Sequence, residues 1–235
     1  MRRAGKIVAA LLTLMEREAK SGVTTKTLDE IAERFIRSQG AEPAFKGYQG
    51  YPASICASVN EEVVHGIPGE KLLQDGDIVG IDVGVKLDGY YSDAARTFPI
   101  GKVDPESLRL ITITREALDR GIAKAVEGNR LSDISHAVQQ HAENNGYSVV
   151  RKYTGHGIGR NLHEEPQVPN FGRPNQGPRL VEGMALAIEP MLNAGTYEVE
   201  ELTDGWTVVT KDGRRSAHFE QSIVVRKEKA EILTE

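Results

Sequence analysis

Apolar residues recur at helical spacing in two pairs of segments, and each pair is followed by short apolar runs typical of strands. The predicted helices span about 2–20, 28–39, 106–126 and 131–146. A capping box from Thr27 to Glu30 would open the second helix, and glycines at 40 and 146 would end the second and fourth. Strands that gather after helix pairs indicate an α+β protein with an antiparallel sheet.

Two strand segments share one pattern, DGDIVGID at 75–82 and EGMALAIE at 182–189. In each, a carboxylate ends a mostly apolar run that starts at a glycine. We therefore predict a single domain over residues 1–235, made of two α-α-β-β halves (about 1–103 and 104–235). The halves would be related by a pseudo-twofold axis around a shared curved antiparallel sheet. A chance match of short apolar strands is the alternative.

The segment GIDVGVKLDGYYSD at 80–93 predicts a β-hairpin with a two-residue Asp-Gly turn at 88–89. This turn pairs Gly84 with Asp93 and places Asp82 and Asp93 on one face as diagonal neighbours. Gly84 lies between them and leaves room for something to approach. Two facing carboxylates repel each other unless a cation lies between them, so a divalent metal is expected here. An exposed edge hairpin is the alternative.

The second half of the chain offers further ligands. Glu189 occupies the position that matches Asp82, and TVVTKDGRRSAHFEQSIVV predicts a hairpin that turns at 212–213 and carries Glu220 into an apolar strand. His156 lies between two glycines that allow close backbone approach. Together with the two aspartates, these residues suit a pair of divalent ions bridged by carboxylates. Alternatively, Glu189 simply ends a strand before proline, and His156 is a polar loop residue.

Composition narrows the class of protein. With 39% hydrophobic and 27% charged residues the chain is typical of a soluble globular protein. The net charge of -5 and pI near 5.8 argue against nucleic acid as the main ligand. Cys56 is the only cysteine, which favours a reducing compartment. No apolar stretch approaches the roughly 20 residues of a membrane span. The run IVAALLTL fits an amphipathic helix, with a targeting segment as the alternative, and we expect a cytoplasmic protein.

Five segments taken together resemble the type I methionine aminopeptidases: GYPASICASVNEEVVHGIP, GIDVGVKLDGYYSDAARTF, TGHGIGRNLHEEP, EGMALAIEP and SAHFEQSIVV. They occur in the family's order, and the resemblance covers nearly the whole chain. It implies the pita-bread fold, which agrees with the predicted repeat. It also implies metal-dependent hydrolysis that removes the initiator methionine from nascent proteins and peptides, favouring a small second residue.

The resemblance assigns a role to each candidate ligand. It implies that Asp82 binds one metal ion, that His156 and Glu189 bind the other, and that Asp93 and Glu220 bridge both. Cobalt, manganese, iron and zinc all suit such ligands. Glu189 is the expected general base, which takes a proton from the attacking water and delivers it to the leaving amine.

The resemblance also names substrate-binding residues. His65 and His163 match the family's two substrate-contacting histidines: His163 would stabilise the oxyanion, and His65 would hydrogen-bond around the scissile amide nitrogen. A pocket for the methionine side chain would be lined by Tyr48, Tyr51, Cys56 and Trp206, with core packing as the alternative. Cys56 is not expected to be a nucleophile, because no base is evident beside it. Asn60 and Ser216 are candidates for a monovalent-cation site.

Two departures from the family's pattern concern the pocket. Leu162 replaces a phenylalanine found in some members, and Phe45 stands where some members have a small residue. The shape of the pocket is therefore expected to differ. Relatives usually carry a short segment before MRRAG. The sequence shows neither the zinc-finger or polylysine extension of type II members nor their long insert in the second half, and we therefore expect a type I member.

Two other function classes stay open. A Xaa-Pro aminopeptidase or proline dipeptidase shares the ligand pattern but usually carries a large extra N-terminal domain. A non-catalytic binding module of the same fold typically loses metal ligands, whereas all five are present here. We expect a monomer whose partner is the N-terminal methionine of nascent polypeptides, with no membrane partner. The sequence leaves transient contact with the ribosome open.

Overall fold

The computed structural model describes residues 1–235 and contains four α-helices. They are α1 (Arg2–Glu18), α2 (Thr25–Ser38), α3 (Pro105–Ile122) and α4 (Leu131–Asn144), with a single 3-10 turn at Tyr48–Gly50. The strands before α3 are β1 (Glu42–Pro43), β2 (Ile55–Val59), β3 (Glu62–Val64), β4 (Ile78–Leu87) and β5 (Tyr90–Pro99). Those after α4 are β6 (Ser148–Val149), β7 (Gly155–Gly157), β8 (Glu164–Val168), β9 (Ala185–Ile188), β10 (Met191–Asn193), β11 (Val199–Glu201), β12 (Val208–Thr210), β13 (Ser216–His218), β14 (Gln221–Val224) and β15 (Glu231–Ile232). The predicted order, a helix pair followed by strands, occurs twice.

Helix ends follow local capping more closely than the apolar pattern. The predicted capping box at Thr27 is wrong, because α2 begins one turn earlier, where the Thr24 hydroxyl accepts a hydrogen bond from the Thr27 N–H (3.1 Å). The helix ends before Gly40, whose φ of 70° matches the predicted stop. Helix α3 ends at Ile122, short of the predicted 126, because the following residues form tight turns and Glu127 N–H then bonds to Arg226 O (2.9 Å).

All pairings between named strands are antiparallel, as predicted. Strand β4 pairs with β5 along one edge and with β1 and β2 along the other. The remaining strands form the orders β15-β14-β9-β7-β8, β13-β10-β6 and β11-β12-β3. Strand β5 connects the first group to the others, because Glu220 N–H donates to Ala95 O (2.9 Å) and Asp93 N–H donates to Ser222 Oγ (2.9 Å).

The second predicted hairpin is wrong. The chain turns at Lys211 and Asp212, one residue before the predicted pair, and the following Gly213 has a φ of 69°. However, β12 pairs with β11 and β3, whereas β13 pairs with β10. The two flanking strands therefore join different sheets, and Glu220 lies at the break between β13 and β14 rather than inside a strand.

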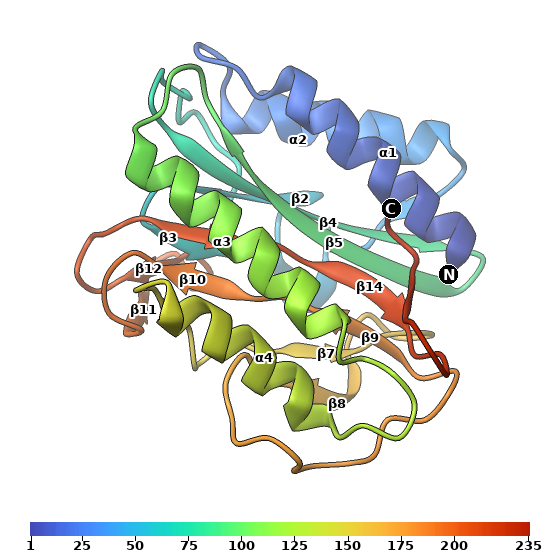
Figure 1. Ribbon diagram of the computed structural model, residues 1–235. Coiled ribbons are helices and arrows are strands. Elements are labelled where there is room, and N and C mark those ends of the chain that lie inside the picture. The colour runs from blue at the N-terminus through green and yellow to red at the C-terminus, as the bar shows by residue number, and fades with distance from the viewer.

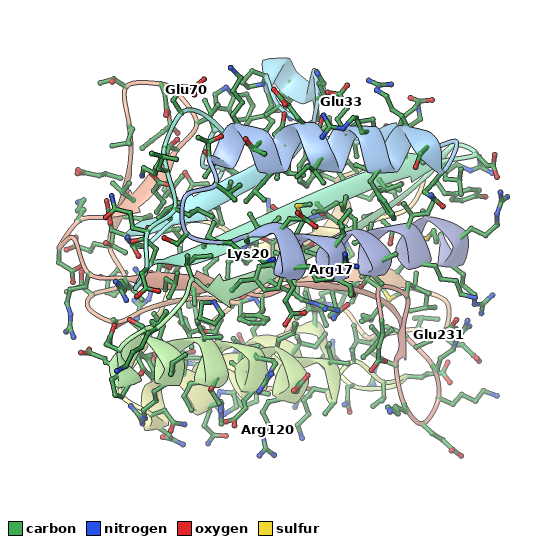
Figure 2. All side chains as sticks on the ribbon, turned by 90° about the horizontal axis from the view of Figure 1, so that it is seen from above. Arg17, Lys20, Glu33, Glu70, Arg120 and Glu231 are labelled. Carbon is green, nitrogen blue, oxygen red and sulfur yellow. The ribbon has the colours of Figure 1, made fainter.

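The helices cover the outer faces of the strands. Helix α1 lies over β4 and β5 with α2 beside it over β1 and β2, and α3 and α4 lie side by side over the strands that follow α4 (Figure 1). Seen from above, Glu33 on α2 and Arg120 on α3 lie toward opposite edges of the view, with Arg17 on α1 between them (Figure 2). The chain's two ends lie near each other, and Arg2 and Glu231 form an ion pair there. No α-helix combines the length and apolar character needed to cross a membrane.

Separate apolar cores hold each helix pair on its strands. One side of α1, including Leu11, Leu12 and Met15, packs with residues of α2, β2, β4 and β5. On the other side, Leu118 and Ile122 of α3 pack with residues of β9 and β14. The opposite faces of β4, β5 and β9 remain free of helices, and the candidate site lies there.

Candidate metal centre

The hairpin of β4 and β5 has the predicted register. Asp88 and Gly89 have φ values of 51° and 76°, as a two-residue turn requires, and Gly84 pairs with Asp93. Asp82 is paired with Ala95, so Asp82 and Asp93 are diagonal neighbours, and their carboxyl groups interact. The hairpin thus brings two carboxylates together from residues eleven positions apart.

The space above Gly84 does not admit a ligand, contrary to prediction. A Cβ atom at Gly84 would lie 2.5 Å from Phe45 Cε1 and 2.9 Å from Ala44 Cβ. The Gly84 carbonyl also accepts a hydrogen bond from Ala44 N–H (2.9 Å). The glycine is therefore needed for the close packing of Phe45, whose ring forms part of the cavity wall.

The three other candidate ligands come from neighbouring strands of the second half. His156 lies in β7 opposite Ala187 of β9, and Glu189 directly follows β9. One ligand atom each of Asp93, His156 and Glu220 lies within 4.8 Å of the others. Glu189 Oε1 lies 3.6 Å from His156 Nε2. All five candidates thus converge on one place, although Glu189 does end a strand.

The glycines beside His156 are needed for strand packing. A Cβ at Gly155 would lie 2.4 Å from Ala187 O, and one at Gly157 would lie 2.3 Å from Glu165 O. Any side chain at either position would push β7 away from its neighbours. The imidazole Nδ1 of His156 lies 2.9 Å from Gly157 O. Because a carbonyl can only accept, Nδ1 carries the proton and Nε2 presents its lone pair to the carboxylates.

The four carboxyl groups lack protein partners that would neutralise them. Buried oxygens of Asp82 (Oδ1), Asp93 (Oδ1) and Glu220 (Oε1) have no hydrogen-bond partner, and neither lysine nor arginine lines the cavity. Buried charges normally require pairing or a metal. An oxygen-rich set with one imidazole suits hard or borderline divalent ions. These residues therefore fit a divalent metal.

Burial raises the pKa of all four carboxyl groups, and repulsion from neighbouring carboxylates raises three of them further. Burial raises the pKa of Asp82 to about 7. Burial is also the main reason why the pKa values of Asp93, Glu189 and Glu220 lie well above normal, and neighbouring carboxylates add to each shift. The pKa of His156 falls to about 4, mainly because of burial. The groups would be charged together at neutral pH only if a cation offset their repulsion.

The five candidate ligands form one wall of a cavity of about 170 Å³. The remaining wall contains the predicted substrate residues, namely Tyr48, Tyr51, Cys56, His65, His163 and Trp206, together with Phe45, Gln49 and Leu162. The ring of Tyr51 packs edge-on against that of Trp206 with centroids 5.0 Å apart. The cavity thus combines a carboxylate end with an aromatic and apolar end.

The histidines and the cysteine differ in their surroundings. His163 is exposed at the rim, where its Nδ1 lies 2.7 Å from the Tyr48 hydroxyl. Burial lowers the pKa of His65 to about 4, so this imidazole is neutral at neutral pH. Cys56 is buried opposite Asp82, and burial followed by the Asp82 charge raises the pKa of its thiol well above normal. A protonated thiol is a poor nucleophile.

His218 is a site residue that the sequence reasoning missed. Its side chain is buried, its Nε2 has no hydrogen-bond partner, and that nitrogen lies 3.8 Å from Glu189 Oε2. The signal was its position two residues before Glu220, since alternate residues of an extended segment face the same side. Asn60 and Ser216 lie together, with Ser216 N–H donating to Asn60 O (2.9 Å), but neither lines the cavity.

Comparison with known proteins gives a consistent result. The sequence model described as metallopeptidase family M24 matches residues 1–227. Methionine aminopeptidase from Clostridium perfringens is 56% identical over 234 residues, covering 100% of this chain and 94% of that protein. Methionine aminopeptidase 1 from Bacillus subtilis is 54% identical with the same coverage. The crystal structure of methionine aminopeptidase from Rickettsia prowazekii matches with a TM-score of 0.99 at 47% identity, covering 100% of this chain and 95% of that one.

Proposed function

The chain belongs to metallopeptidase family M24, and from that premise we propose that it hydrolyses the peptide bond after an N-terminal methionine. One observation supports the proposal: five side chains of the kinds that bind divalent metals and an apolar wall line the same cavity. A cavity of about 170 Å³ suits one side chain and the free end of a peptide. Substrates would be newly made polypeptides in the cytoplasm, with the ribosome as a transient partner and the protein acting as a monomer.

Asp82, Asp93, His156, Glu189 and Glu220 would hold two divalent ions, with Asp93 and Glu220 shared between them. When bound, such ions supply Lewis-acid activation of water and of the scissile carbonyl. The unpartnered oxygens of Asp82, Asp93 and Glu220 and the free Nε2 of His156 support these assignments. A monovalent cation near Asn60 and Ser216 is the weaker part of the proposal, because the Asn60 amide oxygen already accepts from Ile78 N–H (3.1 Å).

Glu189 would act as the general base. Burial raises the pKa of this carboxyl, which makes the carboxylate a stronger proton acceptor. It would accept the proton of the attacking water at a carboxylate oxygen and deliver it to the departing amine nitrogen. Its place between His156 and His218 supports this role, because both neighbours restrict the orientation of the carboxylate.

The remaining residues would bind and orient the peptide. Tyr48, Tyr51, Cys56 and Trp206 would surround the methionine side chain. His163 at the rim would donate to the carbonyl oxygen as negative charge develops there, and His65 would contact the scissile amide nitrogen. Since Phe45 and Leu162 also line the cavity, they would help to exclude water and limit the size of the first side chain.

The decisive experiment removes metal by chelation, restores single divalent ions, and follows product release from Met-Gly-Met-Met. The proposal predicts methionine release that depends on added metal and falls as the second residue becomes larger. Release from a Xaa-Pro peptide alone would instead assign an aminopeptidase or dipeptidase specific for proline. Metal binding without turnover of either substrate would indicate a binding module. Calorimetric titration of the stripped protein would count the ions, with two expected.

A further inference from the structure

The hydrogen bond between Tyr48 and His163 connects distant parts of the chain. Tyr48 Oη lies 2.7 Å from His163 Nδ1, and the ring centroids are 5.2 Å apart. Tyr48 belongs to the 3-10 turn before β2, whereas His163 lies in the loop before β8. The bond thus joins the two residues across the rim of the cavity, although 115 positions separate them.

The turn that carries Tyr48 is held firmly by its own backbone. Gly47 N–H donates to Tyr51 O (2.8 Å) and Tyr51 N–H donates to Tyr48 O (2.9 Å). The Tyr51 hydroxyl in turn donates toward the carbonyls of Ile55 and Gly66 (3.1 Å each). The Tyr48 ring is therefore anchored to β2 and its surroundings, so its hydroxyl can set the orientation of His163.

A neutral imidazole has one protonated nitrogen, and the partner of the other nitrogen decides which one it is. If the Tyr48 hydroxyl donates to Nδ1, the proton of His163 resides on Nε2. The opposite arrangement would leave a bare Nε2 lone pair on a cavity lined by four carboxylates. An ionised carboxylate accepts hydrogen bonds and does not donate them, so an Nε2–H is the electrostatically favoured form wherever one of these groups carries its charge.

We propose that Tyr48 is a positioning residue that donates its hydroxyl proton to His163 Nδ1 and thereby fixes the Nε2–H tautomer of His163. The catalytic consequence of this inference rests on the proposed function, whereas the tautomer itself does not depend on it. With Nε2 protonated, His163 is a hydrogen-bond donor to a developing oxyanion and cannot act as a metal ligand through that nitrogen. Tyr48 would thus separate the roles of His163 and His156, whose rings lie 4.3 Å apart between centroids.

The direct test is nitrogen NMR of metal-free protein labelled with [15N]histidine, at a pH above the titration of the imidazoles. The signals of His163 would be identified by their loss in His163→Asn. We expect an unprotonated Nδ1 and a protonated Nε2 in the wild type, and a mixture of tautomers in Tyr48→Phe. A protonated Nδ1 in the wild type would overturn the proposal. This readout needs no turnover, so it is independent of the proposed function.

Kinetics on the metal-loaded protein form the second arm. Tyr48→Phe keeps the ring and loses only the donor, so kcat for Met-Gly-Met-Met should fall about tenfold to a hundredfold with little change in KM. The same change in a His163→Ala background should have almost no further effect. An equal loss in both backgrounds would contradict the proposal, because Tyr48 would then act on the substrate directly. Tyr197→Phe, which removes an exposed hydroxyl elsewhere, is the matched control and should leave kcat unchanged.

Discussion

The core beneath α1 and α2 and the carboxylate cluster of the cavity are built in opposite ways. The core consists of apolar side chains, including Leu12 and Ile81, that are fully buried. The cavity gathers four carboxyl groups, and four of the seven buried side-chain atoms without a hydrogen-bond partner belong to it or to His218 beside it. The first region stabilises the fold, whereas the second carries repulsion that the rest of the fold must offset.

The largest difference between the regions should appear in Asp93→Asn. This change removes a charge from the centre of the carboxylate cluster, so metal affinity should fall and hydrolysis should decrease by about three orders of magnitude or more. The metal-free variant should melt no lower than the metal-free wild type, since repulsion with Asp82 and Glu220 is relieved. Activity assays, metal titration and thermal melting measure these effects.

Asp88→Asn, in the exposed turn of the same hairpin, is the control and should keep wild-type activity. A metal-free Asp93→Asn protein that melts well below the wild type would contradict the comparison, because the carboxylate would then stabilise the fold.

The core should respond in the reverse manner. Leu12→Ala removes a fully buried side chain and should lower the free energy of unfolding by about 3 kcal/mol, while kcat at low temperature stays near that of the wild type. Denaturant unfolding measures the free energy of unfolding. Activity assays well below the melting temperature measure kcat. Leu108→Ala, the same change at an exposed position of α3, should cost far less. Equal costs at both positions would rule out this assignment of the core.

The pH dependence of the metal-free protein sharpens the comparison. The folded pKa of Asp82, about 7, lies above its ordinary value of 3.8, so the unfolded chain releases this proton first. The contribution of Asp82 to the free energy of unfolding of the metal-free protein is therefore complete at low pH, and it is lost as the pH rises toward 7. A divalent ion favours the charged form, so the rise in melting temperature on adding Mn²⁺ should be larger at pH 7.5 than at pH 5. An equal or larger rise at pH 5 would contradict the raised pKa.

The smallest effect is expected at the surface. Hydrogen bonds from Arg2, followed by Arg226, lower the pKa of Glu231 to about 2. Because this pKa is lower in the folded protein than in the unfolded chain, Glu231 stabilises the fold above about pH 4.5, and this contribution is lost as the pH falls toward 2. Because Arg2 is exposed and Glu231 is only partly buried, Glu231→Gln should cost only about 0.5 kcal/mol at pH 6, and the difference should vanish near pH 2. Glu200→Gln, at an exposed position without an ion pair, is the control in the same melting series. A difference that persists at pH 2 would exclude this linkage.

Local sequence patterns were sufficient for much of the fold. The amphipathic spacing predicted all four helices, and the Asp-Gly turn predicted the register of β4 and β5, including the pairing of Gly84 with Asp93. These features depend on contacts between residues near in sequence. The second hairpin failed because β12 and β13 each find a better partner elsewhere, which turn residues at 212 and 213 do not reveal.

The candidate ligands could also be identified from the sequence, because carboxylates and a glycine-flanked histidine are unusual in apolar segments. Only the tertiary structure decided how they meet. It placed Phe45 against Gly84, brought the unnoticed His218 within 3.8 Å of Glu189, and joined Tyr48 to His163. Each of these contacts links distant segments, and its geometry depends on how helices and sheets pack rather than on any local propensity. The sequence therefore determined which groups are available, and the packing of the two halves determined what each one faces.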